Sequence, residues 1–524
     1  MTAADITQKF RTFLSIERIF LLLFLIAFIA RFAVLDLKLF HHDEAVHAWF
    51  SWRLLTTGSY TYDPVYHGPF LYYVTAGMFS LFGDSDLVGR IIPALAGTLM
   101  VPLVYPVYRL GYISGRQAVA AALFLAVSPD MVYFSRFLRN DIFIAFFTLL
   151  LLVAALAWLE RGDRKYLFLG TAAAALGMCA KENMPLVLAI FVLYGAYAAW
   201  RGAIRLPPRW KTDLLMAAVL GAGIMAVLYS SFFQAPDVLL DGWLRAIEHW
   251  TAMHQQQRLG GPPYFYLMLF GLYELPLLLL ACIALVQFVL PPKPADGAAP
   301  GGIDAVFNRL IRVGMPSAPD RQEEFFRFCI IWMLGSLMLY AYIGEKVPWL
   351  ILHQLLPLVF VAVYRMDRDR WKSVLAVIAA VFLAGMTLHV AFTPADVNEP
   401  IVQVQNSEEL RTIMAAIDGA DRAIITTDSY WPLPWYYRGQ TNSHLIYLQP
   451  GTGIDTLLAR NASVIIAHDT ESYPLIPGYT KTTLRQSYWF SVHDNKDRLL
   501  EYYVTREGRV GSVNWDLFTR TGSA

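Results

Sequence analysis

The chain has 524 residues, of which 42 are Lys or Arg and 41 are Asp or Glu, for a formal net charge of +1. Hydrophobic residues make up 56% of it and charged residues only 16%. This composition excludes an ordinary soluble globular protein, and the balanced charge gives no reason to expect a nucleic-acid partner. Runs of about 20 apolar residues recur, the length that a helix needs to cross ~30 Å of hydrocarbon. We therefore predict a polytopic α-helical protein embedded in the lipid bilayer.

About eleven membrane spans are predicted from these runs. They cover residues 19–38, 88–108, 117–129, 141–159, 166–180, 184–200, 212–232, 265–290, 328–343, 348–364 and 373–393. Every second gap between spans is rich in Lys and Arg, as in the gaps at 160–165 and 365–372. The positive-inside rule places these gaps, and the N-terminus, in the cytoplasm. The other gaps then face outward from the plasma membrane, including a long first loop at 39–87.

After the last span the composition changes to alternating helix and strand signals. Residues Asn406–Ile417 have helical spacing, with a capping box from Asn406 to Glu409. Two short strands and a second helix follow, at Ala423–Thr427, Ser463–Ala467 and Ile454–Arg460. We therefore predict a transmembrane domain at 1–394 and a small extracytoplasmic α/β domain at 395–524.

The first outward loop begins with three histidines and two adjacent acids, in the segment Leu39–Trp49. If this segment is helical, Asp43 and His47 share a face while Glu44 points about 100° away. The segment can also be an ordinary solvated loop next to the membrane. A divalent metal is a further alternative, although the spacing of its candidate ligands is not specific. These candidates are His41, His42, Asp43 and His47.

The other outward loops place ionisable groups at span boundaries, where an unpaired charge is costly. These groups are Arg136, Arg139, Asp141, Lys181, Glu182, Glu345, Lys346 and His353. Asp141 can pair with one neighbouring arginine and leave the second for an anionic ligand. Lys181 and Glu182 are adjacent and can form a local ion pair. Lys346 either reaches out from a span boundary or contacts a phosphate.

Acids, histidines and cations on one side of a membrane suit the transfer of a sugar from a lipid phosphate. Such a reaction needs a base that deprotonates an acceptor hydroxyl. It also needs cations that stabilise the charge of the departing phosphate. A carboxylate and several basic side chains at the interface meet both needs, while a groove between spans would hold the isoprenoid tail.

Several short motifs follow one another in residues 39–185. They are Asp43-Glu44, Tyr66-His-Gly-Pro-Phe-Leu-Tyr-Tyr73, Phe82-Gly-Asp-Ser85, Arg90-Ile-Ile-Pro-Ala-Leu-Ala-Gly97 and the segment Ser128–Asp141. In this order they resemble the GT-C glycosyltransferases of the protein-mannosyltransferase type, a group that includes the lipid A aminoarabinose transferase. The block GEKVPWL at 344–350 and the outward C-terminal domain are similar to a prokaryotic branch that is often labelled flippase-activity-associated, in the setting of archaeal-type protein glycosylation.

The resemblance implies the GT-C fold and an inverting transferase that uses a polyprenyl- or dolichyl-phosphate sugar, without a nucleotide sugar or a required cofactor. Asp43 would be the base, and Glu44 would orient the acceptor or share that role. The donor phosphate would be held by Arg90, Arg136 and Lys346, together with Arg139 and Lys181. The residues expected to line the site are His42, His47, Tyr66, His67, Asp141, Glu182, Glu345 and His353. The acceptor can be a lipid, a glycan or a protein.

Two other functions agree with the same residues. A flippase, or an accessory protein of a flippase, would bind the lipid-linked sugar without chemistry, and Asp43 would be dispensable. An oligosaccharide transferase would use a lipid pyrophosphate donor and would favour a divalent metal. The chain also departs from the family's His-Pro-Pro pattern, because it has His67-Gly-Pro.

Overall fold

The computed structural model describes residues 15–256, 261–290, 310, 320–439, 444–492 and 494–521. The chain is mostly helical and divides into two compact units. The first unit contains the chain up to Leu35, Gly58–Val74 and Arg90–Phe392. The second contains Asp36–Thr57, Thr75–Gly89 and the chain from Thr393 onward. Much of the first outward loop therefore groups with the C-terminal region.

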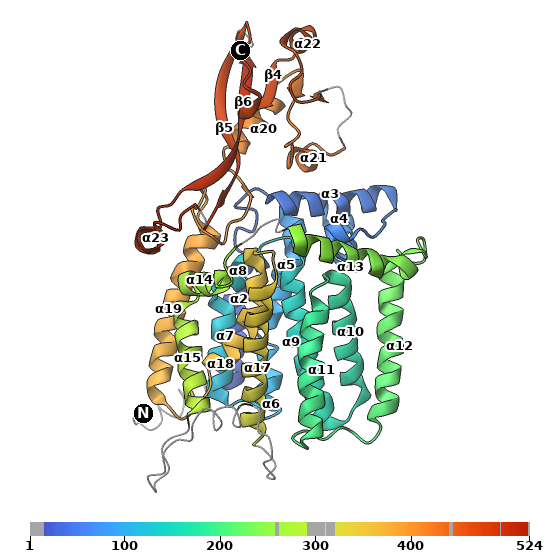
Figure 1. Cartoon of the computed structure of the whole chain (residues 1–524), viewed down its shortest axis with the longest axis vertical. Helices are drawn as coiled ribbons and strands as arrows, with labels where there is room; N and C mark the ends of the chain where they lie inside the picture. Colours follow the sequence, from blue (N-terminus) through green and yellow to red (C-terminus); the bar gives the residue numbers. More distant parts are fainter. Residues whose placement is uncertain are drawn as a thin grey trace, which may run out of the picture. The chain divides into compact units, whose positions relative to one another are not determined.

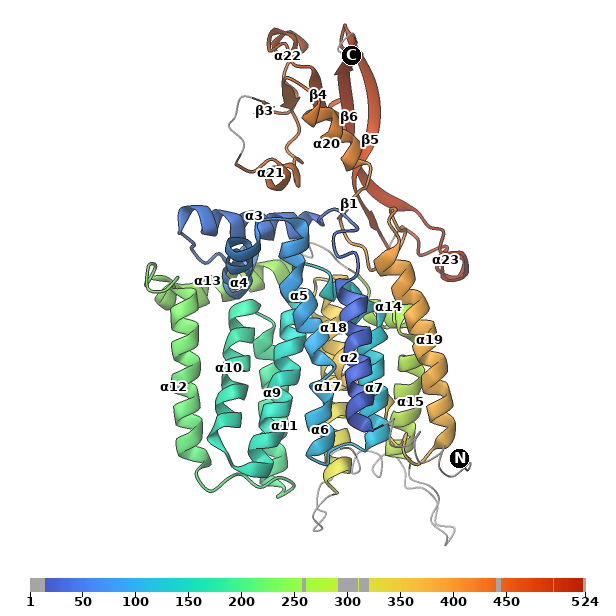
Figure 2. The same ribbon diagram turned by 180° about the vertical axis from the view of Figure 1, so that it is seen from behind.

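The first unit is a bundle of α-helices (Figure 1 and, from behind, Figure 2). Its helices are α2 (Ile16–Phe32), the main part of α5 (Asp86–Met100), α6 (Val104–Arg109), α7 (Gly115–Val127), α8 (Pro129–Ser135), α9 (Asp141–Arg161), α10 (Arg164–Ala180), α11 (Met184–Trp200), α12 (Trp210–Tyr229), α13 (Val238–Gln256), α14 (Phe265–Tyr273), α15 (Leu275–Val289), α17 (Arg321–Tyr342), α18 (Leu352–Ala362) and α19 (Arg370–Phe392). Short 3₁₀ helices lie at η1 (Pro64–Tyr66) and η2 (Pro348–Ile351).

Each predicted span falls on one or two of these helices, so the predicted multi-pass helical fold is confirmed. Among the described residues, five helices are long and apolar enough to cross a membrane, or up to seven if each bent pair is one span. The predicted number of spans is therefore not confirmed.

Burial separates the central helices from the peripheral ones. Of the most apolar 18-residue stretch of each helix, 72% is buried in α9, compared with 17% in α12 and 33% in α19. A helix that is apolar all round and buried belongs to a core. The helices α12 and α19 expose much apolar surface. Contact of such a surface with lipid is favourable, whereas contact with water is costly.

Two pairs of consecutive helices are bent, one at the end of the predicted span 117–129 and one within the predicted span 265–290. The angle between α7 and α8 is 53°, and that between α14 and α15 is 112°. Pro129 lacks a backbone N–H, and the hydroxyl of Ser128 accepts from the N–H of Met131, so Ser128 caps the new helix. The same hydroxyl donates to the buried carboxylate of Glu274, where the second bend lies. The first bend leads the chain into the loop at 136–140, which contributes to the candidate site.

The second unit contains α3 (His42–Thr57), most of α4 (Phe70–Phe82), the start of α5 and a six-stranded sheet with the order β1-β5-β6-β4-β2-β3. The strands are β1 (Gln405–Asn406), β2 (Ala423–Ile425), β3 (Leu445–Tyr447), β4 (Val464–His468), β5 (Tyr479–Phe490) and β6 (Val510–Arg520). β2 pairs in parallel with β3 and β4, and the other pairs are antiparallel. The helices are α20 (Leu410–Asp418), α21 (Leu433–Tyr436), α22 (Ile454–Ala459) and α23 (Leu499–Thr505).

The neighbouring strands β2 and β4 are buried on both faces of the sheet. Ile425 belongs to a core that α20 helps to cover, and its neighbour Ile424 belongs to a second core that contains Leu457 of α22. This burial explains the short apolar runs that predicted β2 and β4. The predicted capping box is wrong, because α20 begins at Leu410 while Asn406 lies in β1 and donates to the carbonyl of Phe40 at 2.6 Å.

Candidate functional site

The helix α3 begins at His42, which places Asp43 and Glu44 in its first turn. Negative side chains are favourable there, because the first N–H groups of a helix have no partner within it. Glu44 Oε2 accepts from the backbone N–H of His41 at 2.9 Å, and Glu44 is only 1% exposed. Asp43 is partly exposed. Of the two adjacent acids, Glu44 stabilises the start of the helix and Asp43 is the more accessible carboxylate.

The ring of His41 has both nitrogens engaged. Its Nδ1 accepts from the backbone N–H of Asp43 at 3.0 Å, and its Nε2 contacts the carbonyl oxygen of Gln403. A ring bonded at both nitrogens has no position left for a metal. Among the described residues, no group of three or more His, Cys, Asp and Glu side chains could hold a metal ion. The arrangement therefore does not fit a metal bound by His41, His42, Asp43 and His47.

Side chains of the C-terminal region hold the segment that leads into α3. The hydroxyl of Tyr436 accepts from the N–H of Phe40 at 3.0 Å. Glu408 Oε1 accepts from the N–H of Leu39 at 3.2 Å. On α3 itself, the ring of Trp49 packs edge-on against that of Trp431, with centroids 5.9 Å apart. The helix that carries Asp43 is therefore positioned by residues more than 350 positions away in the sequence.

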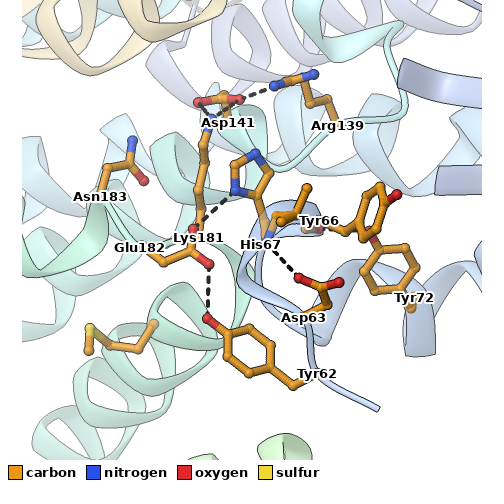
Figure 3. A network of polar contacts seen from close by, with 12 residues as sticks. Tyr62, Asp63, Tyr66, His67, Tyr72, Arg139, Asp141, Lys181, Glu182 and Asn183 are labelled. Atoms are coloured by element: carbon orange, nitrogen blue, oxygen red, sulfur yellow. Dashed lines mark hydrogen bonds and ion pairs between the residues drawn. The ribbon is translucent and has the colours of Figure 1, made fainter. Parts of the chain in front are cut away.

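In the first unit, the carboxylate of Asp141 is the centre of a buried polar network (Figure 3). Both of its oxygens accept from Lys181 Nζ at 2.9 Å. His353 Nε2 lies 3.3 Å from Oδ1, and Arg139 Nε lies 3.5 Å from Oδ2. Asp141 thus pairs with a lysine as well as an arginine, and Lys181 contacts Asp141 rather than forming the local ion pair with Glu182 that was one of the alternatives.

Burial shapes the charge of this network. It lowers the pKa of the Lys181 ammonium, an effect that the Asp141 carboxylate opposes. Burial likewise lowers the pKa of the Arg139 guanidinium, and the negative charges of Asp141 and Glu345 oppose this effect. The guanidinium also lies over the ring of Trp349, 3.6 Å from its centroid. One carboxylate thus orients two cations in a region of low dielectric constant, where their action on an anion is strong.

A second cluster surrounds Glu182, on the turn between α10 and α11 (Figure 3). Glu182 Oε2 lies 3.0 Å from His67 Nδ1, and Oε1 accepts from the hydroxyl of Tyr62 at 3.2 Å. Burial raises the pKa of Glu182, but His67 opposes this and, with weaker contributions, holds the pKa below its ordinary value. Glu182 is therefore an ionised hydrogen-bond acceptor next to the cationic cluster.

The departure from His-Pro-Pro has a structural reason. Gly68 donates from its backbone N–H to the carbonyl of Ala180 at 3.2 Å, which a proline could not do. A Cβ at this position would also lie only 2.1 Å from the carbonyl oxygen of Cys179. The close approach brings His67 to Glu182. The neighbouring Tyr66 contributes its carbonyl, which accepts from the hydroxyl of Tyr72 at 2.7 Å.

Three of the predicted phosphate ligands donate to backbone carbonyls at, or just beyond, the C-terminal ends of helices. Arg136 donates to the carbonyls that end α2, the shortest contact being 2.7 Å to Ala33. Lys346 donates to the carbonyls that end α17, at 2.8 Å for Tyr340. Arg90 donates to the carbonyl of Leu35 at 3.1 Å. Cations stabilise such ends, so these contacts favour a structural role, and phosphate binding by the three stays a prediction.

The structure thus sorts the predicted residues into three groups. It brings together Arg139, Asp141, Lys181 and His353, with His67 and Glu182 beside them. It places Arg136 and Lys346 at helix ends and Arg90 against the turn that follows α2, whereas His42, Asp43, Glu44 and His47 lie in the second unit.

Sequence reasoning missed two members of the network. Tyr62 lies in an aromatic run that is typical of an interfacial belt, so the sequence offered no reason to assign it to the site. Asn183 donates to His353 at 2.7 Å and to the hydroxyl of Tyr340 at 3.2 Å. Only its place directly after the charged pair could have signalled this role.

Residues 66–230 match the family described as dolichyl-phosphate-mannose-protein mannosyltransferase. This segment contains His67, Arg139, Asp141, Lys181 and Glu182. A comparison with curated protein sequences finds no match.

Two solved structures share the fold. One is ArnT from Cupriavidus metallidurans bound to undecaprenyl phosphate, with a TM-score of 0.61 and 14% identity over 96% of this chain and 98% of that chain. The other is the Archaeoglobus fulgidus oligosaccharyltransferase in complex with Zn and sulfate, with a TM-score of 0.50 and 13% identity over 86% of this chain and 68% of that chain. The predicted resemblance to GT-C glycosyltransferases of the protein-mannosyltransferase type is confirmed.

Proposed function

We propose that this chain, which has a GT-C fold and the motifs of the protein-mannosyltransferase type, is an inverting glycosyltransferase. It moves a sugar from a polyprenyl- or dolichyl-phosphate donor to a hydroxyl of a lipid, glycan or protein acceptor at the outer face of the plasma membrane. The observation that carries the proposal is the pair of cations, Arg139 and Lys181, which one buried carboxylate orients inside the matched segment.

The proposed transfer is a single displacement. Asp43 takes the proton of the acceptor hydroxyl as that oxygen forms a bond to the anomeric carbon of the sugar. The bond between this carbon and the phosphate oxygen breaks at the same time, and the electron pair stays on the lipid phosphate. Attack from the side opposite the leaving group inverts the anomeric centre. This displacement needs neither a metal nor a nucleotide.

Arg139 and Lys181 stabilise the charge that develops on the departing phosphate. Groups that are already oriented cost little reorganisation when the charge appears, and burial strengthens their effect. Asp141 provides this orientation, since it contacts both cations and His353. The isoprenoid tail of the donor stays in the bilayer, in contact with apolar helices.

The test is a single-turnover assay with purified protein in lipid nanodiscs. Release of a labelled hexose from polyprenyl phosphate is followed with a membrane fraction as acceptor. The variants are Asp43→Asn and, as a matched control, Asp36→Asn, because Asp36 is exposed and lies seven positions earlier. Each is measured with and without EDTA, and donor binding is measured separately.

We expect release by the wild type and by Asp36→Asn, insensitive to EDTA, and loss of release in Asp43→Asn with donor binding retained. Loss of release on EDTA treatment would support a metal-dependent transferase instead. Donor binding without release by the wild type, while a positive-control enzyme uses the same acceptor fraction, would leave a flippase-associated protein as the better account.

A further inference from the structure

A pocket of about 240 Å³ lies in the first unit, between α13 and the ends of α10, α11 and α12. One side is formed by Val238, Gly242 and Ala246, which repeat at intervals of four on one face of α13. Most of the remaining lining is apolar. The residues that bring polar groups to the lining include Glu182 and Tyr62, which bond to each other in the second cluster described above.

Glu182 fixes the kind of group that this end of the pocket can receive. A carboxylate has about four acceptor positions. In Glu182 some of them are used by His67, Tyr62 and the residue's own backbone N–H, which leaves room for a further donor. The carboxylate repels a phosphate and accepts hydrogen bonds from hydroxyl or amine groups. The pocket therefore suits a ligand that donates hydrogen bonds and carries no negative charge.

The aromatic lining adds a second requirement. The rings of Tyr62 and Tyr229 are perpendicular to each other, with centroids 4.8 Å apart, and Trp250 lines the pocket from α13. The faces of aromatic rings are negative and attract the positive edges of C–H groups. A pyranose ring combines C–H faces with hydroxyl groups around its rim, so it matches both the rings and the carboxylate.

We propose that this pocket binds a neutral sugar ring, whose hydroxyl groups donate to Glu182 and whose C–H faces pack against Tyr62, Tyr229 and Trp250. The inference rests on the proposed function and names its sugar-binding residues. Lys181 and Glu182 are adjacent, yet their side chains contact different partners (Figure 3). The turn at 181–182 thereby separates an anion-binding side from a hydroxyl-binding side. The ring belongs either to the lipid-linked donor or to a glycan acceptor, and both sources share this chemistry.

The test fills the pocket from α13. Ala246→Phe places a ring in the pocket, because Ala246 is buried and lines it. Leu244→Phe is the matched control on the same helix, since Leu244 is 61% exposed. The probes are polyprenyl-phosphate mannose, glucose and galactose, bare polyprenyl phosphate, and p-nitrophenyl hexosides. Their binding is measured at equilibrium with protein in nanodiscs, and thermal unfolding checks the fold of each variant.

If the pocket holds the donor sugar, Ala246→Phe weakens binding of at least one sugar-loaded lipid by tenfold or more and leaves the bare lipid within twofold. If it holds an acceptor glycan, only hexoside binding falls. Equal losses for loaded and bare lipids would identify an isoprenoid groove and overturn the proposal, as would unchanged binding of all probes.

A second variant covers the case in which Ala246→Phe does not fold. Glu182→Gln keeps the size of the side chain but loses its charge, and it is expected to weaken sugar-loaded lipid or hexoside binding while sparing the bare lipid. Unchanged binding of every probe by this variant contradicts the proposal. Failure of the wild type to bind bare polyprenyl phosphate would instead count against the proposed transferase, which separates the two inferences.

Discussion

The indole N–H of Trp435 donates to Asp86 Oδ1 at 2.7 Å, and the hydroxyl of Tyr436 donates to Oδ2 of the same carboxylate at 2.7 Å. Trp435 is fully buried and stacks on Phe79 of α4, with centroids 5.5 Å apart. Asp86 starts α5, at the end of the first outward loop. Within the second unit, therefore, the C-terminal region and the outward loop share one partly buried hydrogen-bonded centre.

The first prediction concerns this centre. Asp86→Ala leaves the buried N–H of Trp435 without its acceptor, and hydrogen bonds to a charged group contribute about 1.5–3 kcal/mol each. We expect the free energy of unfolding of the second unit to fall by about 2–4 kcal/mol. Transfer activity should fall more than donor affinity, because the same region positions the helix of Asp43.

Hydrogen exchange of residues 36–57 measures this effect directly. Faster exchange is expected in Asp86→Ala and not in Asp455→Ala, which changes an exposed aspartate of α22. Unchanged protection of 36–57 in Asp86→Ala would show that the outward loop keeps its structure without this contact.

The sequence allowed prediction of the elements that obey a simple period. The helix α9 was expected at 141–159 and covers Asp141–Arg161, because an apolar run of this length has one stable structure in a membrane. The strands β2 and β4 were predicted because each is a short apolar run, which is typical of a strand buried on both faces. Contacts between residues that are distant in the sequence could not be predicted. Asn406 bonds to Phe40, 366 positions away, and this contact replaced the predicted capping box.

The candidate site was predictable in its composition and only partly in its pairing. Lys181 and Glu182 were correctly found as a charged turn, but neighbouring side chains point apart, so each finds its partner on another element. Arg136 and Arg139 looked equivalent in the sequence. Only the tertiary structure places one against the end of α2 and the other beside Asp141.

A second prediction concerns Gly68, whose N–H donates to Ala180 and whose missing side chain admits the carbonyl of Cys179. Gly68→Ala adds a Cβ where no space exists, so we expect a loss of about 3 kcal/mol in the free energy of unfolding. Gly68→Pro also removes the donor and should cost more. Restoring the family's His-Pro-Pro pattern should therefore harm this chain.

Thermal unfolding in detergent tests this expectation against Gly77→Ala. Gly77 is exposed in the interior of α4, and a Cβ there meets no atom within 4 Å. This control should be neutral or stabilising by about 0.5–1 kcal/mol. A Gly68→Pro protein as stable as the wild type would show that the turn rearranges freely.

A third prediction follows from Glu182. Burial raises its pKa, but His67 and weaker contributions bring the folded-state pKa below the ordinary value of 4.5. The folded state thus binds this proton less tightly than the unfolded state does. The associated stability is present above pH 4.5 and is lost as the pH falls through the folded-state pKa.

Unfolding midpoints measured in nanodiscs from pH 7 down to 3.5 test this dependence. Stability of the wild type should decline below about pH 4.5, and Glu182→Gln should decline less steeply because glutamine does not titrate. Glu248→Gln changes an exposed carboxylate of α13 and should keep the wild-type profile. Identical slopes for the wild type and Glu182→Gln would mean that other groups dominate the acid response.

The fourth prediction concerns the different roles of Arg136 and Arg139, which the sequence alone could not distinguish. Arg136 donates to the carbonyls of Arg31, Ala33 and Val34, so Arg136→Met should lower the free energy of unfolding by about 2–3 kcal/mol. Donor affinity of the folded variant should change little. Arg139 is oriented by Asp141, which keeps other partners when Arg139 is replaced. Arg139→Met should therefore cost less stability.

The distinguishing measurement is binding of bare polyprenyl phosphate. A charge-assisted contact to phosphate of about 1.5–3 kcal/mol corresponds to a loss of roughly 10- to 100-fold in affinity for Arg139→Met. The reverse pattern, with phosphate affinity lost in Arg136→Met and stability lost in Arg139→Met, would move the phosphate site to the end of α2. The carbonyls there would then compete with the ligand for one guanidinium, whereas the site beside Asp141 offers two cations already held together.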